Sequence, residues 1–324
     1  MTARTRTALL ALLALGAALP FLPALNAPFL EWDDALLLAE NARWRGFSAA
    51  NVRWMMTTVF GGPYQPLSWL TYALDFTLWG ANPAAMRAVN YALHACSSVL
   101  MFLIVEDLIR KASPSSAARE RAAAALFAAL FWAVHPLRVE SVVWLTERRD
   151  VLSGFFYLLA VFFYLRDPEK PLRPLFAFCL AVLSKASVIT LPLTLILLDR
   201  WVLRRRAWAD KIPYLLIAAA AGVTGLAGQF DTGMLKGAEV GAGERLAFGV
   251  HSLWWYAAKT AWPSGLSPYH RVPEGFGLAS PAARGAALGL LALGASAWAA
   301  RGRFPAVPAA LLQYALALAP MAGL

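Results

Sequence analysis

The stretch ALLALLALGAALPFLPALNAPFLEWDD, residues 8–34, decides the fold class. Its apolar run from Ala8 to Leu30 is about as long as a helix that crosses a bilayer requires. Two adjacent carboxylates, Asp33 and Asp34, stand just beyond this run, after Glu31 and Trp32. Acidic side chains at a bilayer surface are costly to hold there. An apolar run followed by two carboxylates therefore predicts a membrane span with a functional acidic pair at its end. The alternative is that the pair lies in an ordinary solvated loop.

The composition of the whole chain agrees with a membrane protein. Of its 324 residues, 60% are hydrophobic and 15% are charged, which excludes an ordinary soluble domain. The net charge of +10 does not indicate nucleic-acid binding, because the basic residues gather in short clusters between apolar runs. Cys96 and Cys179 lie inside apolar segments without a metal-binding spacing, so we expect packing roles for them and no metal site.

The N-terminus allows two interpretations. Arg4 and Arg6 before an apolar run also resemble the start of a secretory signal. We favour a retained helix, because the run to Leu30 is about twice as long as the apolar part of a signal, although Pro20 and Pro23 must kink it. The N-terminus would then be cytoplasmic and the acidic pair would lie outside.

Eight further apolar segments raise the expected number of spans to about nine. They lie near residues 83–109, 121–137, 150–166, 172–184, 186–203, 212–229, 282–300 and 304–322. Four basic clusters belong on the cytoplasmic side: Arg4 and Arg6; Arg110, Lys111, Arg119 and Arg121; Arg166, Lys170 and Arg173; and Arg200, Arg204, Arg205, Arg206 and Lys211. The sequence therefore predicts an all-α polytopic transmembrane helix bundle that forms a single membrane domain over residues 1–324.

Two long external loops are expected, each with an interfacial helix. The first, residues 31–82, carries the acidic pair and an aromatic segment at 66–79 that suits the headgroup level. The second covers residues 230–281 and contains the run 246–262. Counting that run as a span would move later arginines to the outside, so we place it in the interface or make it re-entrant.

Two polar groups follow the span near residues 121–137. Pro136 can end that helix, which leaves His135 and Glu140 at the outer surface. The next span opens with four charged residues of both signs: Glu147, Arg148, Arg149 and Asp150.

These four charges allow two interpretations. They can neutralise one another at the surface, since such pairs are common and weak. Alternatively, the planar guanidinium groups of Arg148 and Arg149 bind a phosphate, while Glu147 and Asp150 fix their orientation. Lys185 favours phosphate binding, because an ammonium group inside an apolar stretch needs an anionic partner, although it can also snorkel to the surface.

A third polar group in the second loop comprises Lys259, His270 and Arg271. His270 alone is more often a surface histidine than a functional one. Taken together, external carboxylates face external cations beside lipid. This combination suits transfer of a glycosyl group from a lipid phosphate, since Arg and Lys stabilise the departing phosphate and an Asp accepts the proton of the incoming hydroxyl.

The same residues carry a resemblance to a known family. They are WDD at 32–34 with Asn41, YQPLSWLT at 64–71, NYALH at 90–94, HP at 135–136, ESV at 140–142, ERRDVLS at 147–153, Lys185 with TLP at 190–192, and Lys259 with WP at 262–263 through Tyr269. Jointly they resemble the C-type (GT-C) integral-membrane glycosyltransferases, as a bacterial relative of the tetratricopeptide-containing protein O-mannosyltransferases. The chain ends at Leu324, where members of that family usually continue.

The resemblance implies inverting, metal-independent transfer of mannose or another hexose, without a cofactor, from a polyprenyl-phosphate donor to a protein or glycan hydroxyl. The reaction would take place on the outer face of the bacterial cytoplasmic membrane. Asp33 or Asp34 would be the catalytic base. Donor-phosphate contacts, in decreasing order of expectation, would be Arg148, Arg149, Lys185 and Arg271. Supporting positions would be His135, Glu140, Glu147, Asp150, Lys259 and His270.

Two other classes of function stay open at this point. A transporter of lipid-linked or small-molecule substrates would also bury charges, but it would more often show repeated halves and broken helices. A non-catalytic subunit of envelope assembly would tolerate the loss of Asp33 and Asp34.

Overall fold

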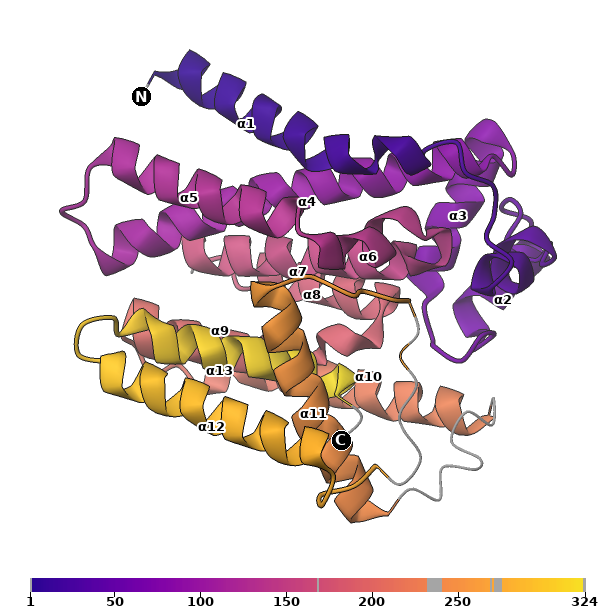
Figure 1. Ribbon diagram of the computed structural model, residues 1–324. Helices are drawn as coiled ribbons and strands as arrows, with labels where there is room; N and C mark the ends of the chain where they lie inside the picture. The colour runs from indigo at the N-terminus through magenta and orange to yellow at the C-terminus, as the bar shows by residue number, and fades with distance from the viewer. Residues whose placement is uncertain (1, 168, 232–240, 269, 271–275, 323–324) are drawn as a thin grey trace. The chain divides into compact units, whose positions relative to one another are not determined.

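The computed structural model describes residues 2–167, 169–231, 241–268, 270 and 276–322. These residues form helices, turns and irregular segments, and no β-strand occurs among them, so the all-α prediction is confirmed. The α-helices, drawn in Figure 1, are α1 (Ala3–Ala18), α2 (Ala49–Thr57), α3 (Pro66–Trp79), α4 (Pro83–Ala112), α5 (Ala118–Ala133), α6 (Val139–Val143), α7 (Arg148–Arg166), α8 (Leu172–Ser184), α9 (Leu191–Leu198), α10 (Ile212–Asp231), α11 (Ala242–Ala261), α12 (Pro281–Ala300) and α13 (Ala306–Leu318).

Fewer of these helices suit a membrane span than the sequence predicts. In the described part of the chain, five segments are long and apolar enough, or six if one bent pair counts as a span: Arg4–Ala24, Pro83–Ala112, Ala186–Leu203, Ala209–Gly228, Pro281–Ala300 and the pair Ala118–Ala133 with Pro136–Val143. The prediction of about nine spans is therefore too high.

The difference has a physical cause in each missing span. Helix α7 begins with Arg148, Arg149 and Asp150, so its apolar part is short. Helices α8 and α13 have 13 residues each, or about 20 Å of helix, while the hydrocarbon core of a bilayer is about 30 Å thick. An apolar stretch in the sequence thus gives a helix here without giving a full span.

The described residues pack as two compact units. The first is drawn from Met1–Leu191 and Ile212–Met234, and the second from Pro192–Lys211 and Leu235–Leu324. A single membrane domain over the whole chain stays a prediction.

The first unit is built around α4, against which α1, α5 and α7 pack (Figure 1). Small side chains bring three of these helices together: Ala122, Ala125 and Ala129 of α5 are buried against Phe102 of α4 and Leu13 of α1. In lipid the driving force for such packing is close van der Waals contact, which small residues permit. Helix α1 continues as a 3₁₀ segment, Leu19–Ala24, because its prolines cannot extend the α-helix.

The directions of these helices place two groups of loops at opposite ends of the first unit. The loop after α1, the N-termini of α4 and α7, and the C-terminus of α5 meet at one end, which carries the acidic pair. The N-termini of α1 and α5 and the C-termini of α4 and α7 meet at the other end. Within this unit, the segments that the sequence predicts to lie outside therefore share one end.

The loop of residues 31–82 is folded rather than open. It contains a π-helical turn (Ala35–Ala39), α2 and α3. Helix α3 has the bounds expected for the aromatic segment at 66–79, and its position in the membrane interface stays a prediction. Trp44, Trp69 and Tyr72 are buried in one cluster with Leu145, which comes from the distant segment before α7. Burial of such large side chains fixes this loop, since truncating a buried tryptophan costs about 3 to 5 kcal/mol.

The second unit contains α11, α12 and α13, with α12 in contact with both others. A side chain at Gly289 of α12 would meet the ring of Trp254 at 2.7 Å, so glycine permits the close approach of α11. Thr260 and Tyr314 join α11 to α13 by a hydroxyl contact of 2.6 Å. Helix α11 is not among the candidate spans, in agreement with the expectation for residues 246–262, and its place in the interface stays a prediction.

Candidate functional site

The two carboxylates of the acidic pair have opposite environments. Asp34 is completely buried. Its Oδ1 accepts hydrogen bonds from the backbone N–H of Thr146 at 2.9 Å and from the Thr146 hydroxyl at 2.6 Å, and its Oδ2 accepts one from Leu30 N–H at 3.2 Å. Asp34 therefore joins the start of the 31–82 loop to the 3₁₀ turn Leu145–Glu147.

Asp33 is exposed, and the described residues give its carboxylate no hydrogen bond or ion pair. Next to it, the ring of Trp32 meets Trp144 edge-on, with 5.9 Å between ring centroids. This aromatic contact joins the same two segments that Asp34 joins. The pair thus consists of one carboxylate that anchors the loop and one that faces outward from it.

A cluster of four charged side chains begins at Glu147, the residue after Thr146, to which Asp34 is hydrogen-bonded. We call Glu147, Arg149, Asp150 and Lys185 the ion cluster. Both Nε and Nη2 of Arg149 donate to Oε1 of Glu147, the former at 3.0 Å. Lys185 donates to Oε2 of Glu147 at 3.0 Å and also to Asp150. Ser141 donates to the other Asp150 oxygen at 3.1 Å, so helix α6 is part of the same network.

The ion cluster shifts the pKa values of its carboxyl groups in opposite directions. Burial acts to raise the pKa of Glu147, but Lys185 and Arg149 outweigh it and lower the value to about 2. Burial raises the pKa of Asp150, with Glu147 adding to the rise and Lys185 opposing it. Glu147 is therefore the ionised counter-ion of both cations at neutral pH, and Asp150 is the member that takes a proton more readily.

Arg148 has a different place from its neighbour Arg149. Its side chain is completely buried. The guanidinium donates to Asn90 at 2.8 Å, to Met86 O at 2.5 Å and to the carboxylate of Asp75, and it lies 4.8 Å from the ring centroid of Tyr72. Arg148 thus fastens the start of α7 to α3 and α4. The role at the donor phosphate that the sequence suggests for Arg148 stays a prediction.

Three residues that support the site were not singled out from the sequence: Tyr72, Asp75 and Arg87. The Tyr72 hydroxyl donates to Leu145 O at 2.6 Å, and burial raises its pKa further above the usual value although Arg148 opposes this. Arg87 donates to Ala27 O, Pro28 O and Val143 O, which holds the chain before the acidic pair. Asp75 and Arg87 are lone charges in apolar helical segments, and that signal could have found them.

The expected supporting residues His135 and Glu140 lie between α5 and α7. His135 is nearly buried; its Nδ1 accepts a hydrogen bond from Leu137 N–H at 3.3 Å, and its ring packs on Phe131. It stabilises the break at Pro136, which ends α5 at Ala133 as the sequence predicts. Glu140 is exposed on α6 and interacts electrostatically with the ion cluster.

The third polar group belongs to the second unit. Lys259 donates to Ser264 O, and its ammonium lies 5.8 Å from the ring centroid of Trp255. The ring of His270 meets the same tryptophan edge-on at 4.8 Å. Lys259 and His270 thus contact the same tryptophan, and Arg271 lies outside the described residues. Across the described ranges, no group of three or more His, Cys, Asp or Glu is arranged to hold a metal ion.

Comparisons with known proteins relate part of the chain to one group of enzymes. It is 30% identical to the human protein O-mannosyl-transferase TMTC1 over 171 residues, 34% identical to Drosophila melanogaster Tmtc1 over 153 residues, and 35% identical to human TMTC4 over 105 residues. These matches cover 49%, 45% and 31% of the chain, but only 18%, 17% and 14% of the relatives. No family model and no solved structure matches. The partial similarity supports a relation to these O-mannosyl-transferases.

Proposed function

We propose that this chain is a membrane glycosyltransferase. It would move mannose or another hexose from a polyprenyl-phosphate donor to an acceptor hydroxyl on the extracytoplasmic side, with inversion at the anomeric carbon. The observation that carries the proposal is the split acidic pair, in which Asp34, hydrogen-bonded to the residue before Glu147 of the ion cluster, anchors an exposed Asp33. The names of the partly similar relatives support a protein hydroxyl as the acceptor.

Asp33 is the better candidate for the general base. A base must reach the proton of the incoming hydroxyl, and the exposed carboxylate of Asp33 is accessible to an acceptor. The carboxylate of Asp34 already accepts three hydrogen bonds and is closed off from solvent. We therefore assign Asp34, together with Thr146, to positioning of the loop that carries Asp33.

Arg149 and Lys185 are the candidates for holding the donor phosphate. Each side chain keeps 14% of its surface exposed, whereas Arg148 keeps none. Arg149 uses two of its five N–H donors on Glu147, and Lys185 uses two of its three on Glu147 and Asp150. The remaining donors can bind a phosphate oxygen, while Glu147 holds both cations in place.

The proposed step balances as a single displacement. The acceptor oxygen forms a bond to the anomeric carbon of the sugar while the bond from that carbon to the phosphate oxygen breaks. The hydroxyl proton passes to the Asp33 carboxylate. The electron pair of the broken bond stays on the polyprenyl phosphate, whose added negative charge Arg149 and Lys185 stabilise. In-line attack from the opposite face inverts the anomeric centre.

The proposal is tested by transfer of labelled hexose from mannosyl and glucosyl polyprenyl phosphates in membranes that contain the full chain. We expect transfer by the parent protein and its loss in the Asp33→Asn/Asp34→Asn double variant. Glu169→Gln is the matched control, because it removes an exposed carboxylate outside the site. If the parent protein transfers no sugar from either donor, the proposal is contradicted and the transporter or assembly classes are favoured.

A further inference from the structure

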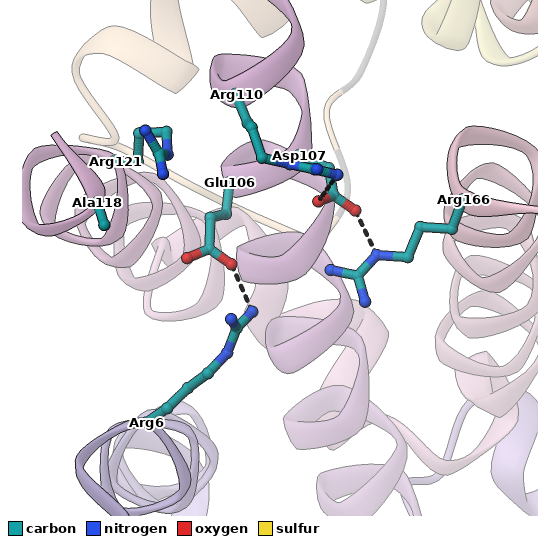
Figure 2. Close-up of a pocket in the computed structure, with 7 residues that line it drawn as sticks. All are labelled: Arg6, Glu106, Asp107, Arg110, Ala118, Arg121 and Arg166. Atoms are coloured by element: carbon teal, nitrogen blue, oxygen red, sulfur yellow. Dashed lines mark hydrogen bonds and ion pairs between the residues drawn. The ribbon is translucent and has the colours of Figure 1, made fainter. Parts of the chain in front are cut away.

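A cavity of about 390 Å³ lies at the end of the first unit opposite the acidic pair. Figure 2 shows its lining side chains, which come from α1, α4, α5 and α7. The lining consists of Arg6, Glu106, Asp107, Arg110, Ala118, Arg121 and Arg166. Four arginines thus face two carboxylates, which gives the cavity a formal charge of +2. None of these residues takes part in the proposed glycosyl transfer.

The carboxylates of the cavity orient its arginines without neutralising them all. Arg6 donates to Glu106 at 2.5 Å. Asp107 accepts from Arg110 at 3.0 Å and also from Arg166, as the dashed lines in Figure 2 mark. Arg121 has no acidic partner among the described residues, and its guanidinium donates to Ser116 O. A guanidinium has five N–H donors, so most donors in the cavity are left for a ligand.

Exposure separates the two kinds of charge. The side chains of Arg6, Arg110 and Arg166 are 40%, 56% and 34% exposed. The side chains of Glu106 and Asp107 are only 14% and 4% exposed. A ligand that enters the cavity therefore meets guanidinium groups first, with the carboxylates behind them. This arrangement suits an anion.

The excess positive charge comes from the side chains and not from the helix ends. The N-termini of α1 and α5 and the C-termini of α4 and α7 meet here, so the dipoles of the four helices largely offset one another. Arginine is also the residue whose planar fork binds phosphate oxygens in pairs, and its charge persists at any physiological pH.

The position of the cavity indicates where its ligand comes from. It lies at the ends of two candidate spans, Arg4–Ala24 and Pro83–Ala112, so in a membrane it would lie where the hydrocarbon region meets the polar surface. Three of the four basic clusters that the sequence assigns to the cytoplasmic side contribute an arginine to it. Basic pockets between membrane helices on that side are suited to anionic lipid headgroups. Phosphate groups of the cytoplasmic leaflet would lie at this depth.

We propose that this cavity binds the phosphate of an anionic membrane phospholipid at the cytoplasmic ends of α1, α4, α5 and α7. The bound lipid joins four helices at the end remote from the acidic pair. A headgroup with two phosphates would match the charge of +2 best. The proposal concerns a site separate from the glycosyl-transfer site, so either proposal can fail without the other.

The test measures lipid binding by native mass spectrometry of the purified full chain in detergent. Phosphatidylglycerol and cardiolipin are compared with phosphatidylcholine of the same acyl chains, and inorganic phosphate is added as a competitor. The variant Arg110→Gln/Arg121→Gln removes two cavity arginines and leaves Arg166 on Asp107. Its matched control, Lys111→Gln/Arg119→Gln, removes two positive charges from the same end outside the lining.

We expect the parent protein to retain anionic lipids in preference to phosphatidylcholine. The affinity of the cavity variant for anionic lipids should fall at least about tenfold, whereas the affinity of the control should stay close to that of the parent. Unchanged helicity and melting temperature in lipid-free detergent will confirm that the variant is folded. An equal loss of lipid binding in the control would show that the overall surface charge causes the effect, and it would contradict a specific site in the cavity. Inorganic phosphate that binds as tightly as the lipids would overturn the assignment to a lipid.

Discussion

At the scale of single residues, Thr146 is the partner that makes the acidic pair a fixed structure. Its hydroxyl and its backbone N–H both donate to Asp34, which lies 112 positions away. Replacing Thr146 by alanine removes the 2.6 Å hydroxyl contact to a buried carboxylate. We expect Thr146→Ala to lower the free energy of unfolding by about 1 to 3 kcal/mol, as measured by thermal or denaturant unfolding in detergent.

Thr146→Ser is the matched control for this prediction. It keeps the hydroxyl and removes only a methyl group, so its stability should stay close to that of the parent. Equal stability of the alanine and serine variants would show that the hydroxyl does not hold Asp34.

Glu147 makes a pH-dependent contribution to stability. Lys185 and Arg149 overcome the effect of burial and lower its pKa from the ordinary value of 4.5 to about 2 in the folded chain. As the pH falls, the Glu147 carboxylate therefore takes up a proton in the unfolded state before it does so in the folded state. Acid thus lowers the free energy of unfolding. The stabilisation is present above pH 4.5 and is lost as the pH falls towards 2, with an upper magnitude of about 3 kcal/mol.

The measurement compares unfolding free energies of the parent and Glu147→Gln between pH 7 and pH 3. We expect a stability gap at pH 7 that narrows as the pH falls. The control Glu169→Gln, which removes an exposed carboxylate, should show no gap at any pH. A gap that stays constant over this range would contradict the ionised, paired state of Glu147.

At the scale of elements, Arg148 fastens the start of α7 to α3 and α4 through Asp75, Asn90 and Met86. Replacing it by methionine leaves the Asp75 carboxylate buried without its cation. We expect Arg148→Met to cost about 3 to 5 kcal/mol of stability, measured by unfolding in detergent. Adding Asp75→Asn should recover part of this loss. A stable Arg148→Met protein whose KM for the donor alone is raised would instead support the phosphate role.

The sequence could predict which segments become helices, because apolar runs and proline positions are local features. The bounds of α3 and the end of α5 before Pro136 agree with the structure. It could not predict the number of spans, since the charged first turn of α7 and the short α8 depend on where each helix begins and ends. An apolar segment can be covered by protein as well as by lipid, and these helices are buried in part by their neighbours. Apolar content alone therefore does not tell a full span from a shorter buried helix.

Neighbouring charges in the sequence proved to have different roles. Residues next to one another on a helix point about 100° apart, so Arg148 turns into the core while Arg149 faces the ion cluster. Asp33 and Asp34 divide in the same way, one exposed and one buried. The sequence could identify both pairs, but it could not predict which member of each pair is buried. The partners that bury Arg148 and Asp34 come from segments far away along the chain.

At the scale of the whole molecule, the orientation of the first unit can be tested by cysteine labelling. In a Cys96→Ser/Cys179→Ser background, Glu31→Cys reports on the loop with the acidic pair and Ser115→Cys reports on the turn between α4 and α5. Because basic residues favour the cytoplasm, a membrane-impermeant maleimide should label the first site in intact cells and the second only after permeabilisation. Labelling of both from the same side would contradict the proposed topology.

The central claim is that Asp33 performs the chemistry while Asp34 holds it in place. The most direct test compares the rate of hexose transfer and the melting temperature of Asp33→Asn and Asp34→Asn, measured on the same purified samples. We expect Asp33→Asn to lose about 100-fold or more of the rate with an unchanged melting temperature, and Asp34→Asn to lower the melting temperature. An Asp33→Asn protein that transfers sugar at the parental rate would contradict the claim.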